Sequence, residues 1–176
     1  VFGRDSGGLI HTYRAEDAET MVIAMGSVLG TIKDVVDEMR DAGHKIGVLG
    51  ITTFRPFPLL AVAAALKHCK RFLVLEKSLA VGIGGIVATN VRMAVTGMGL
   101  KGYTVVAGLG GRAITMKSLT SLFEKAGRDE LDLLTFLDLD WNAVNKQLER
   151  EKQTRRSGPA AEAMLRDLGT VASKIS

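Results

Sequence analysis

Short apolar segments alternate with longer segments of helical periodicity along most of this chain. The first apolar segment, residues 20–25, has no polar residue after its initial threonine, which is typical of a strand buried on both faces in a parallel sheet. Gly26 and Ser27 follow it, and the Ser27 hydroxyl is predicted to cap a helix. This helix is predicted to end at Gly43. Its apolar stripe consists of Leu29, Ile32, Val35, Val36 and Met39.

The same pattern of strand, turn and helix recurs. Buried strands are predicted at residues 45–52, 71–77 and 103–107, and helices at 59–68, at 86–95 and after Thr115, a predicted cap. Residues 9–14 alternate in polarity and predict an edge strand. Repeated units of this kind indicate an α/β fold with right-handed crossovers. The ligand or partner surface of such a sheet lies at the carboxyl ends of its strands, where the strand order reverses.

Composition changes after this α/β region. Residues 1–8 contain three glycines and predict a linker or arm, residues 9–127 the α/β domain, and residues 128–176 a tail. In the tail, residues 131–140 alternate leucine with aspartate and are predicted to be extended. Two amphipathic helices are predicted next, one with Trp141, Val144 and Leu148 on its apolar face and one running from Ala161 to Ile175. We expect the tail to pack on the domain or on a neighbour.

Charge and composition exclude several function classes. The 23 basic and 19 acidic residues are interspersed and give a net charge of +4, and aromatic residues make up 5%, which argues against nucleic acid as the main partner. The longest apolar run is too short to cross a bilayer, and no secretory signal is evident. A single cysteine, Cys69, cannot form an internal disulfide and favours a cytoplasmic location. Because the sequence starts at Val1, we expect a fragment or processed piece.

Two glycine clusters, residues 82–85 and 108–111, are candidates for binding phosphate through backbone N–H groups. Neither has the spacing of a dinucleotide fingerprint or a P-loop, so close packing of strand, turn and helix is the favoured interpretation. Arg112 could hold an anion, although a salt bridge at a domain face is favoured. Ser27 is not in a nucleophile elbow, which leaves capping as its predicted role.

Other reactive residues are scattered. His11, His44 and His68 are far apart in sequence, and His68 is adjacent to Cys69 without helical spacing, so no metal site is expected. The sequence pair Glu76 and Lys77 ends a predicted strand and is the best-placed charged pair for a site, although an interface or sheet-edge ion pair is the favoured alternative. The residues define no self-sufficient active site.

Several motifs in a fixed order carry a resemblance to a known family. They are Met25-Gly26-Ser27, residues 50–58 (Gly-Ile-Thr-Thr-Phe-Arg-Pro-Phe-Pro), 74–77 (Val-Leu-Glu-Lys), 82–85 (Gly-Ile-Gly-Gly) and 107–112 (Ala-Gly-Leu-Gly-Gly-Arg). From about residue 7 to 126, the chain resembles the carboxyl-terminal, transketolase C-terminal-like domain of the α subunit of pyruvate (2-oxoacid):ferredoxin oxidoreductases.

This resemblance implies a three-layer α/β/α sandwich. Its five-strand mixed sheet would have an antiparallel first strand and the order first, third, second, fourth, fifth, with residues 20–25 in the middle. The resemblance also implies that the whole enzyme oxidatively decarboxylates pyruvate to acetyl-CoA with thiamine diphosphate, Mg²⁺ and iron–sulfur clusters. Its electrons would pass to ferredoxin, and the family can also run the reaction in reverse.

The family's reactive groups lie outside this piece. Thiamine diphosphate is held between the amino-terminal domain of the α subunit and the β subunit, and CoA is associated with the γ-type domain. Clusters need several cysteine thiolates. The resemblance therefore implies no catalytic, cofactor-binding or metal-binding residue here. It implies instead an assembly domain, inactive alone, with the thiamine-binding domain of the same subunit, the β subunit and the other subunits as partners.

Three strand-end loops are the candidate packing face: Gly26-Ser27, Phe54-Arg55-Pro56 and residues 108–112. The two tail helices are expected to clasp a partner subunit. Two alternatives remain open. One is a nucleotide- or CoA-binding α/β domain that uses its glycine turns, and the other is an interaction module without a ligand.

Overall fold

The computed structural model describes residue 3 and residues 8–153. The chain forms two compact units, Val1–Asp138 and Leu139–Ser176. The first unit contains the described strands and four of the described α-helices. It therefore extends past residue 127 and includes part of the predicted tail.

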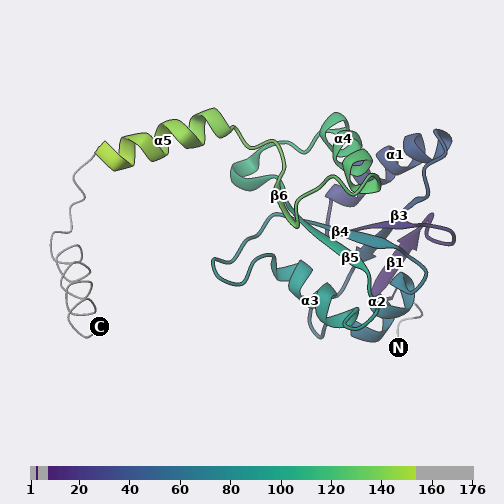
Figure 1. Ribbon diagram of the computed structural model, residues 1–176. Helices are drawn as coiled ribbons and strands as arrows, with labels where there is room; N and C mark the ends of the chain where they lie inside the picture. The colour runs from purple at the N-terminus through teal and green to yellow at the C-terminus, as the bar shows by residue number, and fades with distance from the viewer. Residues whose placement is uncertain (1–2, 4–7, 154–176) are drawn as a thin grey trace, which may run out of the picture. The chain divides into compact units, whose positions relative to one another are not determined.

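The first unit is built on one mixed sheet with the strand order β1-β3-β2-β4-β5-β6 (Figure 1). The strands are β1 (Ile10–Tyr13), β2 (Thr20–Ala24), β3 (Ile46–Ile51), β4 (Arg71–Glu76), β5 (Lys101–Val106) and β6 (Leu134–Phe136). Strand β1 is antiparallel to β3, and the other neighbours are parallel. The predicted fold class, the antiparallel first strand and the order of the first five strands are confirmed.

The sheet has a sixth strand that the expected five-strand order lacks. Strand β6 pairs with β5, with Leu134 opposite Thr104. Thr104 N–H donates to the carbonyl of Leu133 over 2.9 Å, and Leu137 N–H donates to the carbonyl of Val106 over 2.9 Å. Because an uncovered β5 would leave these backbone groups without partners, the start of the predicted tail completes the sheet. Only three residues of the segment predicted to be extended form this strand.

Two helices cover each face of the sheet, which gives the predicted three layers (Figure 1). On one face lie α1 (Val28–Asp41) and α4 (Met116–Gly127), and on the other lie α2 (Leu59–Leu66) and α3 (Ile86–Ala94). All five residues of β2 are buried, as the unbroken apolar run predicts. The predicted stripe of α1 is also confirmed, since Ile32, Val35, Val36 and Met39 are buried against the sheet.

The helix ends show which capping predictions hold. Gly43 has φ +89° just after α1, and the Thr115 hydroxyl accepts the Ser118 N–H over 3.2 Å, so both predicted helix boundaries are confirmed. The prediction for Ser27 is wrong, because its side chain makes no capping hydrogen bond. Its backbone is already helical (φ −64°, ψ −24°), whereas a capping side chain needs the extended conformation. The first turn is closed instead by Leu29 N–H, which donates to the Gly26 carbonyl.

The second unit contains α5 (Trp141–Gln153), which agrees with the first predicted tail helix. Asp140 caps it, because the carboxylate accepts the Ala143 N–H over 3.0 Å. The second predicted tail helix and nearly all of the predicted linker lie outside the described residues. Within the described residues, no helix is long and apolar enough to span a membrane.

Candidate functional site at the carboxyl ends of the strands

The strand order reverses between β2 and β4, because the chain passes from β2 outward to β3 and from β4 outward to β5 on the opposite side. A hollow of about 210 Å³ opens at the carboxyl ends of these strands. It is lined by Met25, Gly26, Ser27, Val28, Leu75, Glu76, Lys77, Ala107 and Ile114. Open α/β sheets bind ligands or partners at this position. The hollow thus brings together the predicted loop Gly26-Ser27 and the predicted pair Glu76 and Lys77.

Glu76 is a structural cap of α3. Glu76 is buried, with 7% of its surface exposed. Its two carboxylate oxygens accept the N–H groups of Val87 and Ala88 over 2.9 Å and 3.0 Å. Ser78 adds a hydroxyl donor over 3.2 Å. A helix N-terminus has unpaired N–H groups and favours negative charge. The favoured sheet-edge ion pair is therefore absent, because neither Glu76 nor Lys77 forms a salt bridge among the described residues.

The first glycine cluster packs against this carboxylate. Gly85 directly precedes α3, and a Cβ added there would lie 2.1 Å from Glu76 Oε1 and 2.8 Å from the Thr104 methyl group. No side chain fits in that space, so glycine allows the end of β4 and the start of α3 to approach. This geometry supports the close-packing interpretation of residues 82–85 over phosphate binding.

The second glycine cluster carries Lys77 and Arg112. Gly108 has φ +74°, and a Cβ added there would lie 2.9 Å from Lys77 Cε, so the lysine side chain runs along this glycine. Leu109–Gly111 form one short 3₁₀ turn. The Arg112 guanidinium donates to the backbone carbonyl of Asp138. The salt bridge that was favoured for Arg112 is therefore absent among the described residues. Its guanidinium donates to a backbone carbonyl and not to a carboxylate.

Arg55 lies in the loop after β3 and is held by neutral groups. Its guanidinium carbon is 3.9 Å from the centre of the Phe54 ring, and its Nη1 donates to the Phe54 carbonyl over 2.9 Å and to Asn90 Oδ1 over 3.2 Å. Since Asn90 belongs to α3, this contact ties the loop to the same helix that Glu76 caps. Sequence reasoning did not identify Asn90, because no local pattern links residues 35 positions apart.

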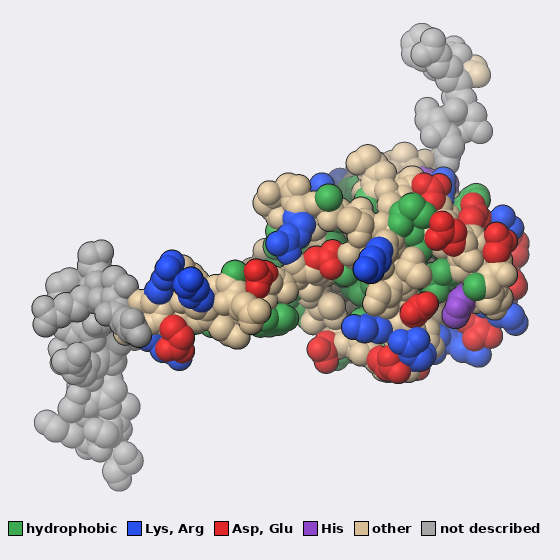
Figure 2. Space-filling view, turned by 90° about the horizontal axis from the view of Figure 1, so that it is seen from above, with side chains coloured by type: hydrophobic (Ala, Val, Ile, Leu, Met, Phe, Trp, Pro, Cys, Tyr) green, Lys and Arg blue, Asp and Glu red, His purple; other side chains and the backbone are tan. Residues whose placement is uncertain are grey.

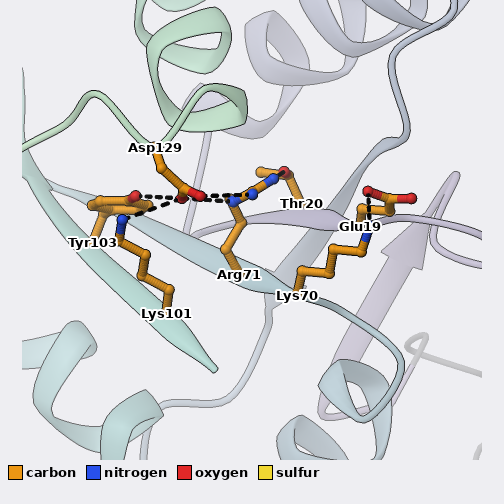
Figure 3. Close-up of polar contacts among 7 residues, drawn as sticks. All are labelled: Glu19, Thr20, Lys70, Arg71, Lys101, Tyr103 and Asp129. Carbon is orange, nitrogen blue, oxygen red and sulfur yellow. Dashed lines mark hydrogen bonds and ion pairs between the residues drawn. The ribbon is translucent and has the colours of Figure 1, made fainter. Parts of the chain in front are cut away.

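The opposite edge of the sheet has a different electrostatic character (Figure 3). There, the Asp129 carboxylate accepts the Tyr103 hydroxyl over 2.8 Å and two Arg71 donors over 3.0 and 3.1 Å, with Lys101 Nζ at 3.4 Å. The Tyr103 hydroxyl, followed by the Arg71 guanidinium, lowers the pKa of Asp129 to about 2. This carboxylate joins the loop after α4 to the starts of β4 and β5.

We expect Asp129→Asn to lower the free energy of unfolding at pH 7 by about 1 kcal/mol, a small value because the carboxylate is partly exposed to solvent. The folded-state pKa of about 2 lies below the ordinary 3.8. The ionised Asp129 carboxylate therefore contributes to the free energy of unfolding above about pH 4, and this contribution is lost as the pH falls towards 2. Urea denaturation at pH 7 and pH 3 measures this difference. Asp34→Asn is the control, because Asp34 is exposed on α1 and has no hydrogen-bond or ion-pair partner among the described residues.

Figure 2 looks down on the face that α1 and α4 cover in Figure 1, and it shows acidic and basic side chains interspersed there. The loops at the carboxyl edge are different. Val81 is 98% exposed, Ile83 70% and Leu109 51%. These apolar side chains lie in or beside the two glycine clusters. Two loops that follow strands lining the hollow therefore expose apolar groups, as is common at interaction surfaces.

The remaining reactive residues do not form a site. His11 lies opposite Gly50 in the β1–β3 ladder, whereas His44 and His68 precede β3 and β4. Cys69 is buried, and burial raises the pKa of its thiol, which does not suit a nucleophile. Within the described residues, no group of three or more His, Cys, Asp or Glu could hold a metal ion.

The fold and the edge geometry define the class of this protein. It is an α/β domain with a transketolase-like arrangement, in which loops with exposed apolar groups lie at the carboxyl ends of the strands. Solved structures agree on the fold. The 2-oxoglutarate:ferredoxin oxidoreductase from Magnetococcus marinus has a TM-score of 0.51 at 16% identity, over 72% of this chain and 20% of its own. A split-gene transketolase (an inactive β4 tetramer) has a TM-score of 0.51 at 12% identity, over 69% and 42%.

Sequence comparisons identify the family. The family model "Pyruvate:ferredoxin oxidoreductase core domain II" matches residues 18–119, and the chain belongs to this family. Pyruvate synthase subunit PorA of Methanosarcina barkeri is 42% identical over 130 residues, which are 71% of this chain and 32% of the relative. Ketoisovalerate oxidoreductase subunit VorA of Pyrococcus horikoshii is 35% identical over 127 residues, 70% of this chain and 32% of the relative. The chain thus spans about a third of the length of these relatives.

Proposed function

We propose that this chain is the carboxyl-terminal assembly domain of the α subunit of a thiamine-diphosphate-dependent pyruvate (2-oxoacid):ferredoxin oxidoreductase. The match of core domain II to residues 18–119 is the observation that supports this proposal most directly. The complete enzyme converts pyruvate and CoA into acetyl-CoA and CO₂ and reduces ferredoxin. The partners of this chain are the thiamine-binding domain of the same subunit, the β subunit and the other subunits, in the cytoplasm.

The residues of this chain do not suit the cofactors of the complete enzyme. An iron–sulfur cluster is held by several cysteine thiolates, but the sequence has only Cys69. The Mg²⁺ that accompanies a diphosphate takes oxygen ligands, and within the described residues no group of three or more His, Cys, Asp or Glu could hold a metal ion. We therefore assign thiamine diphosphate, Mg²⁺ and the clusters to other parts of the complex, and no catalytic residue to this chain.

The contribution of this chain is a preorganised packing face at the carboxyl ends of the strands. Its loops are held from within the domain, by Glu76 at the start of α3 and by the contact of Arg55 with Asn90. Loops that already have their bound conformation lose less entropy when they dock. The face includes the three loops predicted from sequence, at Gly26-Ser27, at residues 54–56 and at residues 108–112.

We expect the purified 176-residue chain to reduce no ferredoxin when it is given pyruvate, CoA, thiamine diphosphate and Mg²⁺. The complete complex that contains the same chain should do so under the same conditions, because it also supplies the cofactor-binding parts. Reduction of ferredoxin or a viologen dye, followed by absorbance, measures both. Turnover by the chain without another subunit would contradict the proposal.

A second candidate function is binding of a nucleotide or CoA, and the hollow beside Lys77 is the observation that favours it. Calorimetric titration of the chain with CoA, adenine dinucleotides, flavin mononucleotide and thiamine diphosphate distinguishes this second candidate from the assembly function. An assembly domain gives no binding heat with any of them. Saturable binding of one of these ligands would favour the second candidate.

A further inference from the structure

Salt bridges are distributed unequally between the two edges of the sheet. All ion pairs recorded between described residues of the first unit lie at the edge where the parallel strands begin: Arg14–Asp37, Arg40–Asp17, Lys45–Glu19, Lys70–Glu19, Arg71–Asp129, Lys101–Asp129 and Arg128–Glu130. At the carboxyl edge, the exposed cations Arg55, Lys77 and Arg112 have no carboxylate within 4.0 Å among the described residues. The edge therefore has three exposed cations that form no salt bridge among the described residues.

The acidic groups of the carboxyl edge do not neutralise this charge. Glu76 is buried and both of its oxygens accept N–H groups of α3. Asp138, at the end of β6, receives Arg112 at its backbone carbonyl and not at its carboxylate. A guanidinium held by neutral acceptors, as in Arg55, keeps its charge available for a carboxylate.

Exposed apolar groups occur in the same loops as two of these cations. Val81 and Ile83 lie in the loop that follows Lys77, and Leu109 lies in the loop whose Gly108 contacts the Lys77 side chain. An apolar centre bordered by charged groups is the usual composition of a protein interface, where the charges set the orientation and the apolar groups supply most of the affinity. The combination fits another protein surface better than it fits a small ligand.

We propose that this edge docks an acidic surface of the same subunit, from the two-thirds of its length that lies outside this chain. Carboxylates of that surface pair with Lys77 and Arg55, and its apolar side chains cover Val81 and Ile83. The proposal rests on the assembly function proposed above and adds the chemistry and the location of the partner surface. The occupant follows from charge complementarity and from the length of the relatives, of which this chain spans only about a third.

A carbodiimide reagent tests the pairing in the assembled complex, because it joins an amine and a carboxylate that already form an ion pair. The carboxylate adds to the carbodiimide, and the amine then displaces a urea and forms the amide. We expect mass spectrometry to find Lys77 joined to an Asp or Glu of the same subunit outside residues 1–176. Lys67 is the matched control, since it is exposed near the end of α2 at the opposite edge and has no recorded partner. A Lys77 cross-link to another subunit or to a second copy of this chain would overturn the assignment.

Double variants test how much the docking surface contributes to assembly of the complex. We expect Lys77→Glu combined with Val81→Asp to weaken assembly of the complex by about tenfold. The control combines Lys67→Glu with Met93→Asp, which introduces the same charges at exposed positions near the opposite edge. Thermal unfolding should be little changed in both, because none of these side chains makes a hydrogen bond or an ion pair among the described residues. Equal assembly of the two variants would refute the docking surface, whereas inactivity of the isolated chain would still support the assembly function.

Discussion

Replacement of Glu76 with alanine is expected to lower the free energy of unfolding of the domain by about 3 kcal/mol, because two buried N–H groups lose a charged acceptor. Val87 and Ala88 donate to this carboxylate from the first turn of α3, where no earlier residue of the helix can accept from them. Alanine leaves both donors buried and unpaired. Water cannot easily replace the carboxylate, since Val87 and Ala88 are themselves buried.

Urea denaturation followed by circular dichroism measures this loss. Glu76→Gln is the matched variant, because its amide oxygen keeps one acceptor in the same place, and we expect it to lose about half as much stability. Ser78→Ala removes only the peripheral hydroxyl donor and should cost well under 1 kcal/mol. Equal stability of the alanine variant and the parent chain would show that Glu76 does not hold α3.

The role of Glu76 also connects stability to the docking edge. Its carboxylate fixes the start of α3, and Asn90, one turn further along this helix, holds Arg55. The loop after β3 and the loop after β4 are therefore positioned by the same helix. Loss of the cap should disturb both loops at once, which a local change at Arg55 would not do.

The apolar pattern was sufficient to predict most of the architecture. Four of the predicted strands are short, largely apolar runs, and most of their residues are buried, which is typical of strands in a sheet covered on both faces. The helices followed from periodicity and from turn residues such as Gly43 and Thr115. The strand order came from the family resemblance, because periodicity alone does not determine which strands are neighbours.

The differences arise where distant parts of the chain determine the outcome. Strand β6 forms because β5 offers an open edge, which a short segment of leucine and aspartate does not reveal. Glu76 looked like half of a charged pair because Lys77 is its sequence neighbour, although its true partners are 11 and 12 residues away. Ser27 has the residue type of a helix cap, but its backbone conformation prevents that role.

Packing between β4 and β5 supplies the second large expected effect. Phe72 is 1% exposed and lies directly opposite Gly102 in the parallel ladder. A Cβ added to Gly102 would lie 2.2 Å from Phe72 Cζ, so the ring occupies the space that a side chain at residue 102 would need. We expect Phe72→Ala to cost about 3–5 kcal/mol through the cavity that it leaves.

Gly102→Val alone should cost about 1–3 kcal/mol, because the new methyl groups meet the ring. In the double variant the valine side chain occupies part of the space that the ring has left. Its loss of stability should therefore be smaller than the sum of the two single losses by more than about 1 kcal/mol. Urea denaturation of the parent chain and the three variants measures this coupling. If the two single losses of stability simply added, the Phe72 ring and a side chain at residue 102 would not compete for one space, and the contradiction would reject this packing explanation for Gly102.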